Sequence, residues 1–568
     1  MNTGGCLAPR TDRFPAAFAW VVTLASMAAL AIFKASDPDL GFHLATGRAI
    51  LQAGALPTTN VLSFAEPAHE WILQQGWPAL LFERLWHWGG IEAVTLCKAV
   101  VVVATWALVL AAARRLGATP PVACATTVLA AWSCGFRFVE RPLIFSNLAL
   151  AAVVFFLSRA WSRPARWRVP VIAVVVVTAA ACHVHAGAVL SFVLLLTGAG
   201  GLLAAGAIRR ALPPGEPAGL RPAAILVVAA VAALALAGLT LALYHPFGLR
   251  VLEIPFRMGT NDFLAEHLIE FRPPWATPFR IVAIYWAFLA VTTALLIARR
   301  ISTAWVLPVL GFAVLSLRHV RLVDAFAIVA CAPVAAAIAA VIRARGSLAR
   351  WRPLAWPAII ALAIAGPVDQ SSRVPMGLGY NLAVWPLPLF EIVRREQLHG
   401  PAFVSDGWAG PWLAFFYPAE RVFFFPSLEA FSDRFVREEY FDVRYGKPGW
   451  DTTLDRHGVE LVLLKYTSPR EREFQGGSDN LRQRLARDPR WILLAFDDMG
   501  AIFVRAAGVN AARARARGIP GVDPDRLVFV GPHDLSRPGL EAAWRRGERS
   551  TRLSALLAAA GRAQSGPE

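Results

Sequence analysis

The sequence predicts a polytopic α-helical membrane protein with about eleven transmembrane helices and a C-terminal α/β domain outside the cytoplasm. The 568 residues are 56% hydrophobic and 17% charged, with a mean hydropathy of +0.50, which is too apolar for a soluble protein of this length. Long apolar runs extend from Phe14 to about Val368, whereas charges, prolines and glycines recur every few residues from Asp369 onward. The chain therefore divides into a membrane part, residues 1–368, and a water-soluble part.

The first apolar segment, residues 15–33, has the length of a membrane crossing and follows Arg10 and Arg13. A cleaved signal peptide is the alternative, but the apolar run is too long for a signal-peptide core, and the A-x-A match at 29–31 lies inside it. We therefore expect an uncleaved anchor with a cytoplasmic N-terminus. Ten further segments have the length or composition of membrane helices: 91–113, 120–136, 142–159, 169–187, 188–206, 223–244, 279–298, 303–317, 322–342 and 353–368.

The distribution of arginines predicts the topology, because alternate connections on the side of the N-terminus are rich in them, as the positive-inside rule requires. These residues are Arg114, Arg115, Arg159, Arg163, Arg166, Arg168, Arg209, Arg210, Arg299, Arg300, Arg343, Arg345, Arg350 and Arg352. Topology thus explains much of the formal net charge of +17, and no nucleic-acid partner is expected. An odd number of crossings after a cytoplasmic N-terminus places the C-terminal domain in the extracytoplasmic, periplasmic space.

The opposite connections are then extracytoplasmic, and two of them are long. The first, residues 35–90, contains two expected interfacial helices, Gly41–Ala53 and Trp77–Trp88, the second with tryptophans suited to lipid headgroups. The seventh segment leads into another long connection, from Tyr244 to Trp275. Two loops of this size on one face indicate a roofed cavity.

Residues 369–506 show the short apolar runs and intervening polar segments of a small α/β domain. The expected strands are Ala402–Ser405, Val422–Phe425, Glu460–Leu464, Trp491–Phe496 and Ala501–Val504, and the expected helices are 431–443, 449–457 and 479–487. Residues 507–568 form an Ala/Arg-rich tail that is peripheral or partly disordered, with its best helix at Glu541–Ala560. All six cysteines precede the soluble part, which excludes a disulfide framework there.

Two carboxylates, Asp37 and Asp39, follow the first apolar segment, and His43 and Arg48 come a few residues later in the sequence. Ionisable groups beside a hydrocarbon boundary are costly unless they have a function. One interpretation is structural, because Asp39 is a favoured residue to cap a helix that begins near position 40. The other is chemical: a carboxylate accepts the proton of an acceptor hydroxyl, or the pair helps to hold a divalent cation such as Mg²⁺ or Mn²⁺. The two are compatible, since a cap would hold a base in place.

Arginines on the predicted outer side are candidates for phosphate binding, because the guanidinium fork matches phosphate oxygens. They are Arg137, Arg141, Arg250, Arg318 and Arg321. Snorkelling toward lipid headgroups is the alternative for each, but Arg318 and Arg321 share a very short connection against the positive-inside trend, which favours phosphate. The pair His183 and His185 lacks a nearby third metal ligand, so we expect His185 to be a hydrogen-bonding residue that lines the site. No Gly-rich phosphate loop, zinc framework or catalytic triad signature occurs.

Three pieces of the first outer loop match a known family: Asp37-Pro38-Asp39-Leu40, residues 43–48 and residues 54–60. With these pieces the loop resembles that of bacterial polytopic GT-C glycosyltransferases. Two tryptophans usually stand in that family where this chain has Gly41-Phe42, which alters an expected aromatic wall. Further matching pieces are Trp71 with Gln75 and Trp77, Arg141–Ser146, His183–Gly187, Tyr244–Gly248 and, more weakly, Phe403–Gly410.

The resemblance implies an inner-membrane enzyme of the cell envelope that transfers a sugar from a polyprenyl-phosphate donor to an extracytoplasmic glycan, lipid or protein acceptor. It implies Asp37 and Asp39 as catalytic residues or ligands of a divalent cation. The candidate substrate-binding residues are His43, Arg48, Trp71, Gln75, Arg141, His185 and His245, which lie in the matching pieces, together with Arg318 and Arg321, which the charge pattern selects. The alternative is a non-enzymatic transporter of lipid-linked glycans or an envelope assembly scaffold, although internal repeats typical of transporters are not evident.

Overall fold

The computed structural model describes residues 13–162, 167–208, 217–261, 263, 267–345, 355–381, 384–385, 387–405, 410–416, 421–465, 481–496 and 500–519. Several sequence predictions lie outside these residues: Arg163, Arg166, Arg209, Arg210, Arg350, Arg352, residues 406–409 and Glu541–Ala560. The chain forms two compact units. We call residues 1–35 and 85–379 the helical unit, and residues 36–84 and 380–568 the α/β unit.

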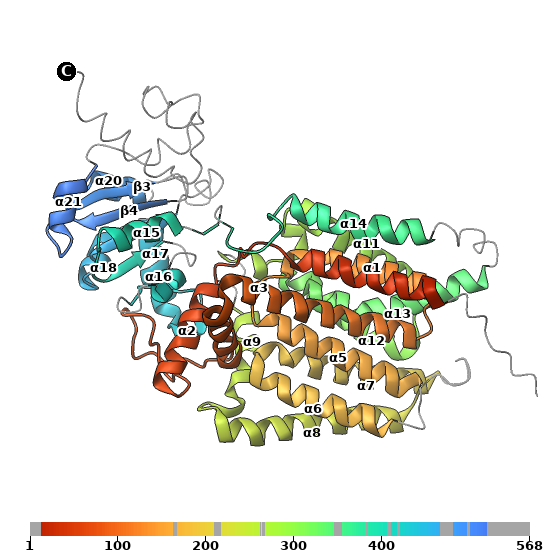
Figure 1. Cartoon of the computed structure of the whole chain (residues 1–568). Coiled ribbons are helices and arrows are strands. Elements are labelled where there is room, and N and C mark those ends of the chain that lie inside the picture. Colours follow the sequence, from red (N-terminus) through yellow and green to blue (C-terminus); the bar gives the residue numbers. More distant parts are fainter. Residues whose placement is uncertain are drawn as a thin grey trace, which may run out of the picture. The chain divides into compact units, whose positions relative to one another are not determined.

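The predicted apolar segments of the helical unit are helices that run side by side (Figure 1). They are α1 (Arg13–Ala31), α3 (Gly76–Arg115), α4 (Pro120–Ser133), α5 (Leu143–Ser162), α6 (Arg168–Val184), α7 (Val189–Ala207), α8 (Leu220–Tyr244), α11 (Phe279–Ile297), α12 (Thr303–Arg318), α13 (Val323–Ala344) and α14 (Ala355–Ser371). Within the described residues, 6 spans are long and apolar enough to cross a membrane, and three shorter helices are also apolar. The polytopic membrane fold is confirmed, whereas the count of about eleven crossings stays a prediction.

The sequence predicted two helices where the structure has the single element α3. Non-helical dihedral angles at Gly89 and Gly90 break it, and Gly90 has a φ of 65°, a conformation that favours glycine. The predicted interfacial helix 77–88 and the predicted crossing 91–113 therefore lie on either side of this kink. The division between the two compact units also falls within α3, between Arg84 and Leu85.

Helix α13 forms the centre of the helical unit, because its side chains are buried along most of its length. It packs against α4, α5, α11 and α12. Its many alanines allow neighbouring backbones to approach closely, which is how membrane helices pack in the absence of a strong hydrophobic drive. Phe326 adds an aromatic contact with both Tyr285 and Phe288 of α11.

The connections of the helical unit gather at the two ends of α13. At its C-terminal end, Arg343 Nη1 donates a hydrogen bond to the Gly117 carbonyl oxygen at 3.0 Å, in the α3–α4 connection. At its N-terminal end, the Val320 amide donates to the Arg272 carbonyl oxygen at 2.8 Å, in the α8–α11 connection. A helix of this length separates its ends by roughly 30 Å, so these arginine-rich and outer connections lie at opposite ends, in agreement with the predicted alternation.

The α/β unit contains a four-stranded sheet of order β1-β2-β4-β3. Strand β1 (Ala402–Val404) is parallel to β2 (Leu461–Lys465), and β4 (Gly500–Arg505) is antiparallel to both β2 and β3 (Trp491–Phe496). Its described helices are α2 (Leu40–Ala53), α15 (Leu387–Arg395), α16 (Gly410–Phe416), α17 (Phe441–Arg444), α18 (Trp450–Arg456), α20 (Leu481–Arg487) and α21 (Ala511–Arg517). Four of the five predicted strands are thus confirmed.

The fifth predicted strand, Val422–Phe425, is wrong. Val422 makes isolated bridges to Ser63 and Ala402 instead of joining the ladder. The apolar run is buried because its rings pack on other aromatic side chains: Phe424 stacks on Tyr440 with ring centroids 3.7 Å apart, and Phe425 contacts Phe431. Burial among rings and burial in a sheet give the same apolar pattern in the sequence. The predicted helix 431–443 is likewise modified, since it contains a π-helical turn over Phe435–Tyr440.

The first outer loop packs into the α/β unit. The Val422 amide donates to the Leu62 carbonyl oxygen at 3.1 Å, and the Phe64 amide donates to the Val422 carbonyl oxygen at 3.2 Å. The Ser63 hydroxyl donates to the Phe423 carbonyl oxygen at 2.9 Å. The sequence analysis counted this loop with the membrane part, whereas the structure groups residues 36–84 with the C-terminal residues.

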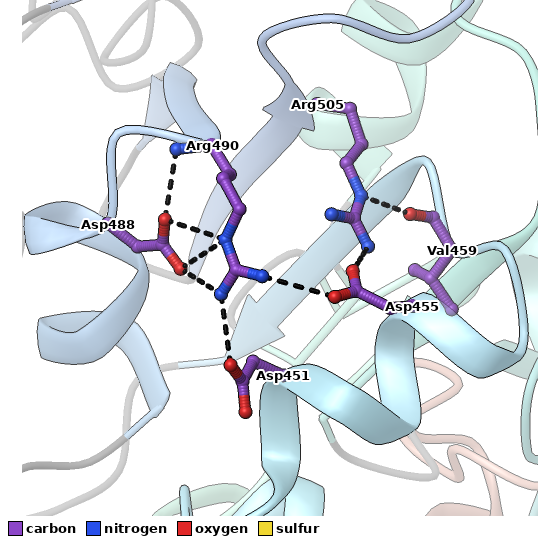
Figure 2. A network of polar contacts seen from close by, with 6 residues as sticks. All are labelled: Asp451, Asp455, Val459, Asp488, Arg490 and Arg505. Carbon is purple, nitrogen blue, oxygen red and sulfur yellow. Dashed lines mark hydrogen bonds and ion pairs between the residues drawn. The ribbon is translucent and has the colours of Figure 1, made fainter.

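An exposed network of charged side chains ties α18 to the sheet (Figure 2). We call Asp451, Asp455, Asp488, Arg490 and Arg505 the aspartate network. The Arg490 guanidinium contacts Asp488 at 2.7 Å and both Asp451 and Asp455 at 3.1 Å. Arg505 contacts Asp455 and also donates to the Val459 carbonyl oxygen at 2.9 Å. The network thereby joins α18, the turn before β3 and strand β4.

Candidate active site

Three arginines of the helical unit surround one carboxylate. Arg141 Nη1 lies 2.8 Å from Glu270 Oε2, Arg137 Nη1 lies 3.6 Å from the same oxygen, and Arg321 Nη1 lies 3.9 Å from Oε1. We call these four residues the arginine cluster. They come from three connections at one end of the helices: 134–142, 245–278 and 319–322. Short 3-10 turns hold three of them, Gly135–Arg137, Ile269–Phe271 and Val320–Leu322.

The arginine cluster gathers three guanidinium groups at one carboxylate. Burial raises the pKa of the Glu270 carboxyl, but Arg141, then Arg321 and Arg137, outweigh this effect and hold the pKa at about 2. Glu270 is therefore ionised at neutral pH and gives one negative charge against three positive charges. The buried Asp324 also interacts electrostatically with Arg321. Guanidinium groups gathered in this way suit an anionic ligand such as a phosphate.

Arg137 has an unused hydrogen-bond donor within the cluster. Its side chain is 9% exposed, and its Nε is buried without a hydrogen-bond partner. Such an atom costs free energy unless a ligand or water accepts from it. Arg321 is oriented by an aromatic contact, because its guanidinium lies 4.5 Å from the centre of the Phe271 ring. The cluster can thus present a fixed guanidinium fork and a free donor to the oxygens of a phosphate.

His185 lies in the connection between α6 and α7. Its Nδ1 accepts a hydrogen bond from the Gly187 amide at 3.0 Å and lies 3.1 Å from the Ser146 hydroxyl of α5. Because Nδ1 accepts, we assign the ring proton to Nε2. His183 instead lies 2.7 Å from Thr240 of α8. The two histidines contact different helices, so the structure does not assemble them as a metal-binding pair.

Asp37 and Asp39 lie in the α/β unit, at the start of α2. Asp37 is buried, and its Oδ1 accepts a hydrogen bond from the Asp39 amide at 2.8 Å. Asp39 stands at the N-cap position, but its side chain makes no capping hydrogen bond, so the structural role considered for it is not observed. The backbone turn thus fixes the Asp37 carboxylate, as a preorganised base requires.

The possible divalent cation at Asp37 and Asp39 stays a prediction. Within the described part of the chain, no group of three or more His, Cys, Asp and Glu side chains is placed to hold a metal ion. Asp37 uses one carboxylate oxygen for a backbone hydrogen bond. Mg²⁺ is often held by one or two carboxylates together with waters and substrate phosphates, so Asp37 and Asp39 remain its predicted ligands. We derive no step through a metal.

The other predicted residues of the first outer loop are buried or make contacts within the α/β unit, and their role in substrate binding stays a prediction. Arg48 donates to the Phe415 carbonyl oxygen at 2.6 Å, pairs with Glu83 at 3.3 Å and covers the Phe415 ring. His43 is buried beside Phe82. Trp71 packs on Phe425, and its indole Nε1 has no hydrogen-bond partner. Gln75 is buried at the start of α3.

The structure explains why glycine stands at position 41, where the resembling family usually has a tryptophan: a larger side chain would collide with Trp412. A Cβ atom at this position would lie 2.8 Å from the Trp412 backbone nitrogen and 2.9 Å from its ring. Trp412 is fully buried and packs on Trp385 and Phe416. The absence of a side chain at Gly41 therefore permits an indole from α16 to lie against α2.

The predicted pair Arg318 and Arg321 is divided between two environments. Arg321 belongs to the arginine cluster, whereas Arg318 is exposed at the end of α12. His245 is the C-cap residue of α8, and its Nδ1 accepts a hydrogen bond from the Phe247 amide at 3.2 Å.

The sequence analysis missed Glu270 and the grouping of Arg137 with Arg141 and Arg321. No local signal identifies Glu270, because its partners lie far away in the sequence.

Comparison with solved structures identifies the fold. The chain is similar to the archaeal oligosaccharyltransferase AglB from Archaeoglobus fulgidus in complex with an inhibitory peptide and a dolichol-phosphate, with a TM-score of 0.57 and 12% identity, over 86% of this chain and 74% of that chain. The apo form of the Archaeoglobus fulgidus oligosaccharyltransferase gives a TM-score of 0.53 at 10% identity, over 88% and 75% of the two chains. ArnT from Cupriavidus metallidurans bound to undecaprenyl phosphate gives 0.46 at 15% identity, over 87% and 97%, which is too low to support an inference.

No protein-family model matches the sequence, and no curated protein matches it in a sequence search. At the identities found, the likeness to oligosaccharyltransferases establishes the fold alone. The GT-C-like fold that the first outer loop predicted is therefore confirmed. The chain is a multi-pass membrane protein of this fold with a small α/β region near its C-terminus.

Proposed function

We propose that this protein is a membrane glycosyltransferase that transfers a sugar from a polyprenyl-phosphate donor to an extracytoplasmic glycan, lipid or protein acceptor. The observation that carries the proposal is the arginine cluster, in which three guanidinium groups face one carboxylate and one buried donor is unused. A phosphate would accept hydrogen bonds from Arg137 Nε and from the neighbouring guanidinium groups. The membrane setting favours a phosphate carried by a lipid.

The proposed chemistry assigns separate roles to the arginines and the aspartates. The acceptor hydroxyl attacks the anomeric carbon of the sugar, and the bond from that carbon to the phosphate oxygen breaks. The phosphodiester of the donor then becomes a monoester, so its charge increases from one negative to two. Arg137, Arg141 and Arg321 stabilise this added charge. Asp37, or Asp39 beside it, accepts the proton that the hydroxyl loses.

The predicted placement in the cell follows from the same proposal. The protein would reside in an inner membrane, with the arginine cluster and the α/β unit on the extracytoplasmic side, where a lipid-linked sugar meets its acceptor. His185, with its proton assigned to Nε2, would donate a hydrogen bond to the substrate. Peptide and dolichol-phosphate are ligands of the similar archaeal enzyme and support a lipid-linked donor here without identifying the sugar or acceptor.

Transfer of a labelled sugar from polyprenyl phosphate by purified protein tests the proposal. Asp37→Asn and Asp39→Asn keep side-chain size but remove the base, and a general base contributes about 10²–10⁴-fold to rate. We expect one of them to lose activity by this factor while the melting temperature changes little, because Asn retains an acceptor for the Asp39 amide. Parental rates in both variants would remove the aspartates from the mechanism.

The alternative function is transport or scaffolding without chemistry. Parent protein that transfers no sugar but moves a lipid-linked sugar between the leaflets of a vesicle would establish the transporter. The arginine cluster would then serve binding of the lipid phosphate alone.

A further inference from the structure

A lysine and a glutamate form a fully buried ion pair in the helical unit. Lys98 Nζ of α3 lies 2.6 Å from Glu140 Oε1, and the two side chains are 2% and 1% exposed. Lys98 Nζ also donates to the Phe33 carbonyl oxygen at 3.4 Å. The second carboxylate oxygen of Glu140, Oε2, is buried without a hydrogen-bond partner. The pair lies outside the arginine cluster, and the proposed mechanism does not use it.

Because the pair is buried, its net contribution to folding stability is expected to be small. Desolvation of two charges offsets much of their attraction, and an apolar pair of similar volume is often as stable. The unpartnered Glu140 oxygen adds a further cost. Ionisable residues within a membrane helix are expensive enough that a role beyond packing is the first hypothesis.

Glu140 lies in the backbone turns that carry two arginines of the cluster. The Val139 amide donates to the Arg137 carbonyl oxygen at 2.9 Å, and the Arg141 amide donates to the Val139 carbonyl oxygen at 2.8 Å. The connection between α4 and α5 therefore makes two successive three-residue turns. Glu140 is the central residue of the second turn, and Arg137 and Arg141 stand at the outer ends of the two. Fixing the Glu140 side chain consequently fixes the backbone that carries both arginines.

Lys98 connects this turn to a second segment. Its contact with Phe33 lies just after α1, four residues before Asp37 in the sequence. The Lys34 and Ala35 amides donate to the carbonyl oxygens of Pro375 and Gly379 at 2.9 Å, so this segment is also held from the side of α14. One ammonium group thus joins the segment that follows α1 to the turn that carries the cluster arginines.

We propose that Lys98 and Glu140 are positioning residues, which hold Arg137 and Arg141 in the geometry that binds the donor phosphate. The inference rests on the proposed function, because it assigns the phosphate to the arginine cluster. The pair acts through the backbone turns at 137–141 and does not touch the substrate.

The test compares binding of undecaprenyl phosphate to full-length purified variants. The double variant Lys98→Met with Glu140→Leu replaces the ion pair by apolar side chains of similar size, which avoids a lone buried charge. We expect its melting temperature to stay near that of the parent and its affinity for the lipid phosphate to fall about tenfold, as when one charge-assisted hydrogen bond is lost. In the transfer assay the loss should be in the KM for the donor, with KM for the acceptor unchanged.

Two further variants separate positioning from general damage. The single variant Glu140→Asp keeps the charge and should bind undecaprenyl phosphate more tightly than the double variant does, though less tightly than the parent. Tyr285→Phe removes a buried hydrogen bond to Ser316, 2.9 Å long, elsewhere in the helical unit, and should leave affinity unchanged. Parental affinity in a folded double variant would overturn the positioning role and leave the proposed function intact. A parent that binds no undecaprenyl phosphate would overturn both.

Discussion

The arginine cluster of the helical unit and the aspartate network of the α/β unit use the same side-chain chemistry in opposite proportions. The cluster places three arginines around Glu270, and all four side chains are at most 26% exposed. The network places three aspartates around Arg490 and Arg505, and Arg490 is 44% exposed (Figure 2).

The difference concerns one buried hydrogen-bond donor, Arg137 Nε. Each aspartate of the network contacts an arginine, and water reaches most of its members, so any remaining charge is solvated cheaply. The arginine cluster holds a buried donor, Arg137 Nε, that has no hydrogen-bond partner. An exposed ion-pair network therefore indicates local structure, whereas a buried donor without a partner among clustered arginines indicates a ligand. The following predictions test that distinction.

The largest expected effect is on donor binding. Arg141→Gln with Arg321→Gln removes two charged donors, each worth about 1.5–3 kcal/mol in a hydrogen bond to a charged group, so affinity for a polyprenyl phosphate should fall by about 100-fold or more. Titration of purified protein with undecaprenyl phosphate measures the change.

Two matched controls belong to this experiment. Arg490→Gln removes an equally charged side chain of the aspartate network and should not change the affinity. Arg318→Gln removes the exposed neighbour of Arg321 and should have a small effect. If Arg318→Gln weakens binding as much as the double variant, the arginine cluster is not the specific binding site of the phosphate.

A smaller effect of opposite sign is expected from Glu270→Gln. The Glu270 carboxylate competes with any phosphate for the same three arginines, so its removal should tighten binding of undecaprenyl phosphate by about tenfold, the equivalent of one charged contact. The melting temperature should fall, because three like charges then lack their shared partner in the free protein. Asp488→Asn is the matched change in the aspartate network and should leave affinity unaltered. Weaker binding by Glu270→Gln would show that Glu270 orders the arginines more than it competes.

The smallest effect is on stability and comes from the aspartate network. Arg490→Gln should cost about 1 kcal/mol or less, because the pairs are exposed and screened by salt. The hydrogen bond from Arg490 holds the pKa of Asp488 below its usual value, so this contribution is present above about pH 4, the unfolded pKa, and is lost as pH falls through the lowered folded value. Urea unfolding at pH 7 and pH 3 measures it. An equal difference between parent and variant at both pH values would contradict the assignment.

The sequence by itself determined the elements whose signal is contiguous. Apolar length located the helices from α1 to α14, since a crossing needs a continuous run of residues. Short apolar runs located β1 to β4, and the polar residues that follow the first apolar segment singled out Asp37. Even the outer arginines were identified one by one, because each stands beside an apolar segment.

Tertiary structure decided which of these residues meet. Glu270 and Arg141 are joined across 129 positions of the chain, Lys98 and Glu140 across 42, and Ser63 and Phe423 across 360. No local pattern encodes such partners, because they depend on how helices and loops pack after the elements have formed. The same limit explains the error at Val422–Phe425, where an apolar run fits a strand or an aromatic core equally well until its neighbours are known. Packing alone grouped Arg321 with Arg137 and Arg141 and left Arg318 exposed, although the sequence presented Arg318 and Arg321 as a pair.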